Sequence, residues 1–187
     1  MKYLIISGSP KSEGLCNSLI ETVSRAAADS GAQYTVLKTD KTVSCRMCSG
    51  GWGTCGSKNE CAFESDGNFG EMHKAVKEAD VIAVVTPVYW GDITEGLKNF
   101  LDRLRRCEAG QDGALSGKQV LLVASAGGSG RGLISCIEQL DRFCQHTSAA
   151  IYDMIGINRW NAEYKMPAVY SAAKALAEKK IPERPKR

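Results

Sequence analysis

Five short apolar runs alternate with amphipathic segments along this chain of 187 residues. The amphipathic segments repeat their apolar side chains at helical spacing, whereas the apolar runs are short and continuous, as in strands buried on both faces. Alternation of strand and helix is typical of a doubly wound parallel sheet, and right-handed crossovers allow the strand order 2-1-3-4-5. We therefore predict an α/β fold with five parallel strands in that order. The expected strands are residues 3–6, 34–37, 81–85, 118–124 and 149–157.

The third apolar run leads into the most informative stretch of the sequence, Thr86–Arg103. Pro87 cannot donate a ladder hydrogen bond, so the strand should end near it. Asp92 and Glu95 have the spacing of a capping box at a helix start. The helix that follows should bury one apolar face. That face consists of Ile93, Leu97, Phe100, Leu101 and Leu104.

A loop of aromatic and small residues separates this strand from this helix. In open α/β sheets, ligands bind at the carboxyl ends of the strands, which is where this loop lies. Its candidate ligand-binding residues are Pro87, Val88, Tyr89, Trp90 and Gly91. Alternatively, Tyr89 and Trp90 cover the top of the core or form a subunit contact.

Two further loops follow the first and fourth strands and should lie at the same edge of the sheet. Ser7–Asn17 joins a strand to a helix start, where backbone amides and the helix dipole favour an anion. The glycine-rich loop 125–132 can bring backbone amides to a ligand. Each loop alone could be an ordinary turn, but their convergence predicts a ligand site. The proposed donors are Ser9, Lys11 and Ser12 in the first loop, which follows the first strand, and Ala126, Gly127 and Gly128 in the third loop, which follows the fourth strand.

Four of the eight cysteines, Cys45, Cys48, Cys55 and Cys61, lie in a segment (41–65) that shows no clear period. A loop of this length in a compact domain is usually functional. Thiolates ligate both iron–sulfur clusters and zinc, although these gaps differ from paired C-x2-C zinc knuckles. A dithiol pair or four inert thiols would also be consistent with this pattern. Cys107, Cys136 and Cys144 are expected to be small buried hydrophobic residues.

Charge and hydropathy exclude several classes of protein. The net charge is +3, and residues 178–187 carry five basic and two acidic side chains, so the rest of the chain is neutral. This distribution argues against nucleic-acid binding. The longest apolar runs are too short for a membrane span or a signal peptide, so we expect a cytoplasmic protein. We predict one domain over residues 1–180, which includes the cysteine segment, and a basic tail over 181–187.

Polar side chains outside the loops suggest no acid–base or nucleophile constellation. His73 and His146 are both expected at the surface of helices. Arg103, Arg105 and Arg106 end a helix, where positive charge complements the helix dipole. A contact with the phosphate of a ligand is the second interpretation of these arginines. Asp66 and Pro167 are expected to mark the starts of two other helices.

Three motifs resemble one known group. T-P-V-Y-W-G-D followed by L-K-N-F-L-D-R resembles the flavin loop and helix of the NADPH-dependent FMN reductase and iron–sulfur flavoprotein group, which has the flavodoxin-like fold. G-S-P-K-x-x-G is similar to the group's phosphate loop, G-S-P-R-x-x-G-N-T, with Leu15 and Cys16 in place of Asn and Thr. The four cysteines are similar to the C-x2-C-x2-C-x4–7-C loop of iron–sulfur flavoproteins, with four extra residues before Cys55.

The resemblance implies a flavodoxin-like oxidoreductase or electron-transfer protein in which FMN carries the chemistry. The phosphate would bind the first loop, where Cys16, Asn17 and Ser18 join the donors named above. The flavin rings would lie between Pro87–Gly91 and Ala126–Gly128. A four-iron four-sulfur cluster would be held by Cys45, Cys48, Cys55 and Cys61.

The resemblance also implies partners. NAD(P)H or ferredoxin would supply electrons to a small-molecule or protein acceptor, and the chain would form a homodimer or homotetramer. Two different functions stay open. One is a cluster-free NAD(P)H-dependent FMN or quinone reductase, and the other is a non-enzymatic electron carrier or a zinc-stabilised interaction module.

Overall fold

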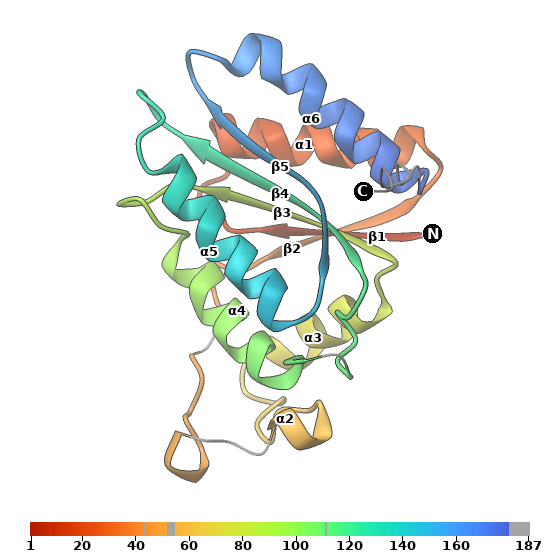
Figure 1. The fold of residues 1–187 in the computed structure, drawn as a ribbon, viewed down its shortest axis with the longest axis vertical. Coiled ribbons are helices and arrows are strands. Elements are labelled where there is room, and N and C mark those ends of the chain that lie inside the picture. The colour runs from red at the N-terminus through yellow and green to blue at the C-terminus, as the bar shows by residue number, and fades with distance from the viewer. Residues whose placement is uncertain (43, 52–54, 111, 180–187) are drawn as a thin grey trace, which may run out of the picture.

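A computed structural model describes residues 1–42, 44–51, 55–110 and 112–179 of the chain. Its sheet is entirely parallel, with the order β2-β1-β3-β4-β5 (Figure 1). The predicted fold class and strand order are therefore confirmed, with β2 at an edge. The strands are β1 (Lys2–Ser7), β2 (Gln33–Lys38), β3 (Val81–Pro87), β4 (Gln119–Ala126) and β5 (Ala150–Asn158).

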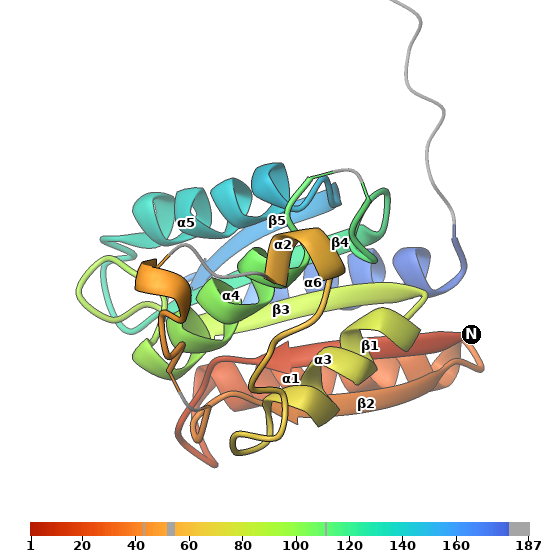
Figure 2. The ribbon, with the colours of Figure 1, turned by 90° about the horizontal axis from the view of Figure 1, so that it is seen from below.

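Helices cover both faces of the sheet, which explains why the central strands are apolar on both sides. On one face lie α1 (Leu15–Asp29) and α6 (Ala162–Ala177), which pack against each other (Figures 1 and 2). The opposite face carries α3 (Phe69–Glu78), α4 (Glu95–Cys107) and α5 (Leu133–His146). The domain is thus a three-layer sandwich with one apolar core on each side of the sheet.

The apolar face predicted around α4 is confirmed. Each of its five side chains is at most 6% exposed, although Ile93 precedes the helix proper. Cys107, Cys136 and Cys144 are buried as predicted. Gly31 follows α1 with a φ of 72° and donates its amide to Ala28, while Ala32 donates to Ala27. This is a Schellman ending, in which a glycine adopts the left-handed conformation just after the helix.

The start of α4 differs from the predicted capping box. Thr94 is the N-cap, and its Oγ1 accepts a hydrogen bond from the amide of Leu97 at 3.4 Å. The same hydroxyl donates to the carbonyl oxygen of Gly8 at 2.7 Å. Asp92 instead accepts from the adjacent amide of Ile93. A buried threonine that also ties down the first loop therefore replaces the acidic cap.

Two other predicted helix starts are wrong. Asp66 pairs with Arg46 at 3.0 Å, and α3 begins later, at Phe69. Pro167 lies inside α6, which begins at Ala162. The earlier start follows from Asn161, whose side-chain oxygen accepts from the amide of Asn158 and turns the chain there.

The cysteine segment is more regular than its sequence indicates. It contains a 3-10 turn, Ser49–Gly51, and a short helix, α2 (Cys55–Lys58), which packs near α4 at the bottom of Figure 1. None of the helices in the described ranges is long and apolar enough to cross a bilayer. The predicted basic tail, 181–187, lies outside the described residues.

Candidate cofactor sites

The three predicted loops meet at the carboxyl edge of the sheet, around the switch point between β1 and β3. In the first loop, Gly8 donates its amide to the carbonyl of Val85 at 2.9 Å. A Cβ atom at this glycine would lie 2.6 Å from Oγ1 of Thr86. The first loop can therefore cross over β3 only because residue 8 is glycine.

The start of α1 is arranged to receive an anion. Its N-cap is Gly14, with a φ of 96°, and no described side chain caps this helix start. The side chains of Lys11 and Ser12 are exposed beside it. Because the first amides of a helix have no partners within it, they are available to an anionic ligand.

The remaining predicted phosphate ligands are engaged within the protein. Oγ of Ser9, which is buried, accepts from the amide of Lys11 at 3.3 Å and shapes the turn. The side chain of Asn17 donates to Glu21, and the hydroxyl of Ser18 donates to the carbonyl of Gly14. In this arrangement the loop offers backbone amides and Lys11 more directly than the side chains of residues 17 and 18.

Cys16 is 6% exposed and lies beneath the first loop. Burial raises the pKa of its thiol to about 11, even though hydrogen bonds with Ser125 and Ser9 act in the opposite direction. The side chain is therefore a neutral thiol that connects the first loop to the end of β4.

The second loop, residues 87–91 after β3, forms a tight turn that presents Trp90 to solvent. Tyr89 and Asp92 exchange two backbone hydrogen bonds of 2.9 Å. Between them, Trp90 and Gly91 have φ values of 55° and 81°, as in a two-residue hairpin turn. Such a backbone is strained for tryptophan. The Trp90 side chain is fully exposed, so it does not cover the core.

The second and third loops are in backbone contact. A Cβ atom on Gly132 would lie 2.6 Å from the Cα of Gly91, and Oγ of Ser135 donates to the carbonyl of Gly91 at 2.5 Å. Gly127 and Gly128 are exposed, and no described heavy atom lies within 4 Å of a Cβ built on either. Their amides are therefore open to a ligand.

A hollow of about 460 Å³ lies beside the first loop. Its walls include Gly8, Tyr89 and Thr94, together with Asp40, Lys41 and Thr42 after β2. We did not predict a role for residues 40–42. They follow a strand of the same parallel sheet, so the rule that predicted the other loops applies equally to them.

The four predicted metal ligands come together at a second place. Cys45, Cys48, Cys55 and Cys61 line one cavity of about 20 Å³. Cys107 also lines this cavity, with Arg46, Arg103 and Arg106. Residues 103–107 belong to the last turns of α4. Helical periodicity alone cannot indicate that side chains of these turns line the cysteine cavity. Across the described ranges, no group of three or more acidic, cysteine or histidine side chains is placed to hold a single metal ion.

Buried charge surrounds this cavity. Arg103 is 3% exposed, and its Nη2 donates to the carbonyl of Phe63 at 2.9 Å and contacts Sγ of Cys61 at 3.5 Å. Its guanidinium also lies over the ring of Phe69 at 4.0 Å. Neither interpretation of Arg103, as a complement to the helix dipole or as a contact for an NADPH phosphate, included these contacts.

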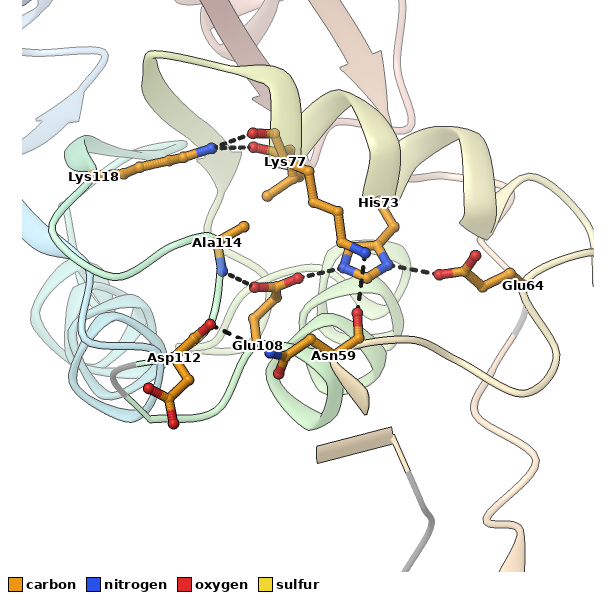
Figure 3. A network of polar contacts seen from close by, with 9 residues as sticks. Asn59, Glu64, His73, Lys77, Glu108, Asp112, Ala114 and Lys118 are labelled. Atoms are coloured by element: carbon orange, nitrogen blue, oxygen red, sulfur yellow. Dashed lines mark hydrogen bonds and ion pairs between the residues drawn. The ribbon is translucent and has the colours of Figure 1, made fainter. Parts of the chain in front are cut away.

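His73 is buried, so the prediction of a surface histidine is wrong. It is 1% exposed and lies between two carboxylates, Glu64 at 2.9 Å from Nδ1 and Glu108 at 2.5 Å from Nε2 (Figure 3). Both ring nitrogens of His73 therefore have a carboxylate partner. His146 is exposed, as predicted.

The His73 network joins the end of the cysteine segment to the end of α4. Glu108 is fully buried and also accepts from the amide of Ala114. Burial works to raise the pKa of Glu108, but the hydrogen bond and charge of His73 outweigh it and lower that pKa. Figure 3 shows Lys77 beside this network, where its Nζ donates to the carbonyl of Asn59 at 3.0 Å.

A parallel sheet in this order, with its loops converging at the switch point, defines a flavodoxin-like α/β protein. Residues 1–158 match the NADPH-dependent FMN reductase family, and the chain belongs to that family. The apo form of the NADH:FMN oxidoreductase EMOB has a similar fold, with a TM-score of 0.70 and 19% identity over 98% of this chain and 91% of that one. At this identity the similarity shows the fold alone.

Curated relatives are named iron–sulfur flavoproteins. One from Archaeoglobus fulgidus is 29% identical over 106 residues, 56% of this chain and 46% of that protein. One from Methanosarcina thermophila is 31% identical over 137 residues, 71% of this chain and 66% of that protein. The chain therefore matches about half to two thirds of the length of these relatives.

Proposed function

We propose that this chain is an FMN-dependent oxidoreductase that exchanges electrons between FMN and an iron–sulfur cluster. One observation carries the proposal: a single chain has both an anion-binding loop system at the switch point and four thiols lining one cavity. Family membership supports the first site, and the names of the relatives support the second.

The three loops fit FMN by their chemistry. The open amides at the start of α1, with Lys11 beside them, suit its phosphate. Tyr89 and Trp90 on one side and the amides of Gly127 and Gly128 on the other suit its rings. Bound FMN supplies hydride acceptance and electron transfer, while the protein provides binding and orientation.

The cysteine cavity fits a cluster by its donors but must widen to admit one. Four thiols match the ligand number of a cubane, whereas a cavity of about 20 Å³ is close to the volume that one water needs. One wall is α4, which is packed into the core, and the other wall is the cysteine segment with only short helical turns. We therefore expect the part of the segment that carries Cys45, Cys48 and Cys55 to move outward when the cluster is assembled, while its end stays against Arg103.

The two sites lie at opposite ends of α4. Thr94 caps the helix beside the flavin loops, and Arg103 and Cys107 reach the cysteine cavity at the other end. The helix has 13 residues and is about 20 Å long. Electron exchange favours shorter paths, so we propose that the cluster of one subunit serves the flavin of another within a homodimer or homotetramer.

Anaerobic visible spectroscopy tests the proposal. We expect flavin bands with a broad brown shoulder, and we expect NADPH or reduced ferredoxin to bleach both. Flavin bands without the shoulder, after cluster reconstitution, would contradict the cluster and favour a cluster-free reductase. A spectrum that lacks both the flavin bands and the brown shoulder would contradict the whole proposal and favour an interaction module.

A further inference from the structure

Arg103 is a buried cation that the flavin chemistry does not use. Its guanidinium lies in the wall of the cysteine cavity, and the groups that hold it there include the carbonyl of Phe63, Sγ of Cys61 and the face of Phe69. A planar guanidinium can stack on a ring and donate from its edge at the same time, which an ammonium cannot do.

The same nitrogen, Nη2, contacts both Cys61 and Phe63. Because these residues are two apart in the chain, one guanidinium fixes the direction in which the end of the cysteine segment passes the cavity. Arg103 is thereby placed to orient the Cys61 thiol toward the other three cysteines.

Burying a cation costs free energy unless nearby groups offset the loss of water. Arg46, which lines the same cavity, is exposed and paired with Asp66. The guanidinium of Arg103 reaches sulfur, since its Nη2 lies 3.5 Å from Sγ of Cys61. An iron–sulfur cluster with four thiolates is anionic and becomes more so on reduction, and hydrogen bonds to its sulfurs and nearby positive charge favour the reduced form.

We infer that Arg103 is a positioning residue that orients Cys61 and raises the reduction potential of the cluster. The inference rests on the proposed function, because it requires a cluster in the cysteine cavity. It assigns to one residue of α4 a control over the direction of electron flow between flavin and cluster.

Three variants test this inference: Arg103→Gln, Arg103→Lys and, as a matched control, Arg105→Gln. Arg105 lies in the same last turns of α4 but lines the groove between α4 and α5. Each protein is reconstituted anaerobically, its iron and sulfide are measured, and the cluster is titrated electrochemically with mediators. Circular dichroism and urea unfolding report the fold and its stability.

We expect Arg103→Gln to make reduction of the cluster about tenfold less favourable, which is a fall of about 59 mV for one electron. Arg103→Lys should give a potential between those of the Gln variant and the unchanged protein, and Arg105→Gln should leave the potential unchanged. If the Gln variant does not assemble a cluster, the Lys variant decides: a potential equal to that of the unchanged protein would overturn the inference.

Failure of the inference about Arg103 and failure of the proposed function would give different results. A cluster present in every protein with equal potentials would overturn the role of Arg103 and leave the proposed function intact, even if stability fell. Absence of iron and sulfide from the unchanged protein after reconstitution would overturn the cluster and this inference together.

Discussion

His73 holds together parts of the chain that are far apart in sequence. Its two carboxylate partners lie nine and 35 residues away, at the end of the cysteine segment and just after α4. Glu64 is partly exposed, but His73 and Glu108 form a buried pair, and removing one member of such a pair leaves an uncompensated charge. The network therefore supports the same wall of the cysteine cavity that carries Cys107.

Replacing His73 with leucine should lower the free energy of unfolding by about 3–5 kcal/mol, because the carboxylate of Glu108 stays buried without its partner. The double variant His73→Leu, Glu108→Leu should lose less than the sum of the two single variants, with a coupling of about 0.5–3 kcal/mol. Urea unfolding of the four proteins measures this cycle. Strict additivity would show that the two side chains do not interact.

Glu108 also predicts a dependence of stability on pH. Its pKa is lowered in the folded protein from an ordinary value of 4.5, so the unfolded chain takes up the proton first as pH falls. The contribution of Glu108 to stability is thus complete above about pH 4.5 and is lost as pH falls through the lower folded value. Glu108→Gln should be less stable at pH 7 and should lose less stability on acidification. Equal slopes for both proteins below pH 4.5 would contradict this.

We expect Lys11 and Ser9 to determine how tightly the first loop binds the phosphate of FMN. Replacing both with alanine removes a charge beside the start of α1 and the hydroxyl that shapes the turn. We expect the dissociation constant for FMN to rise at least tenfold, because one charge-assisted hydrogen bond contributes about 1.5–3 kcal/mol. Riboflavin, which lacks the phosphate, is the control ligand and should bind both proteins equally. Equal weakening for the two ligands would argue against a phosphate site.

The start of α4 links helix capping to the flavin loops. Thr94 accepts from the first turn of the helix and donates to Gly8, so one hydroxyl serves two segments. Thr94→Ala should lower the free energy of unfolding by about 1–2 kcal/mol, near the upper range for a cap. Glu95→Gln, at the next and exposed position, should change it by less than about 0.5 kcal/mol. If Glu95→Gln lowered the free energy of unfolding more than Thr94→Ala, urea unfolding would favour the predicted capping box over the Thr94 cap.

Strands and helix faces could be predicted from the sequence, because continuous apolar runs and helical periodicity are local signals of burial. Helix starts were less predictable, since Asp92 and Thr94 compete for one role and tertiary contact with Gly8 favours Thr94. Likewise, a single histidine carries no sequence signal of burial when its partners are distant. The partners of His73, Glu64 and Glu108, lie nine and 35 residues away, so the local sequence pattern could not indicate that His73 is buried.

The sites were predictable to the extent that they follow from topology. Parallel strands bring their carboxyl ends together, so three loops could be assigned to one ligand site, and residues 40–42 could have been added by the same rule. The approach of Arg103 and Cys107 to the cysteine segment depends on where a long segment packs against α4. No spacing in the sequence encodes that contact.

The whole molecule presents apolar side chains next to its flavin loops. Trp90 is fully exposed, and Ile134 is 78% exposed beside Ser135, which binds Gly91. Exposed apolar side chains gathered near a functional site commonly mark an interface. With the two proposed cofactor sites at opposite ends of α4, this surface is our candidate for a contact between subunits.

Light scattering at micromolar concentration should therefore give at least a dimer. Trp90→Ser should shift the equilibrium toward the monomer, while Tyr34→Ser, which removes an exposed aromatic side chain near the amino end of β2, should not. A monomer in the unchanged protein would contradict assembly through this surface. Equal effects of the two substitutions would show that Trp90 has no special role in it.

The central claim is that one chain holds both FMN and an iron–sulfur cluster, and stoichiometry measures it most directly. Flavin, iron and acid-labile sulfide are determined on one anaerobically reconstituted sample, beside Cys55→Ala and the control Cys144→Ala, whose cysteine is buried in the core away from the cavity. We expect about one FMN, four irons and four sulfides per chain, with iron and sulfide lost only in Cys55→Ala. One FMN with a single zinc, or with no metal, would contradict the claim.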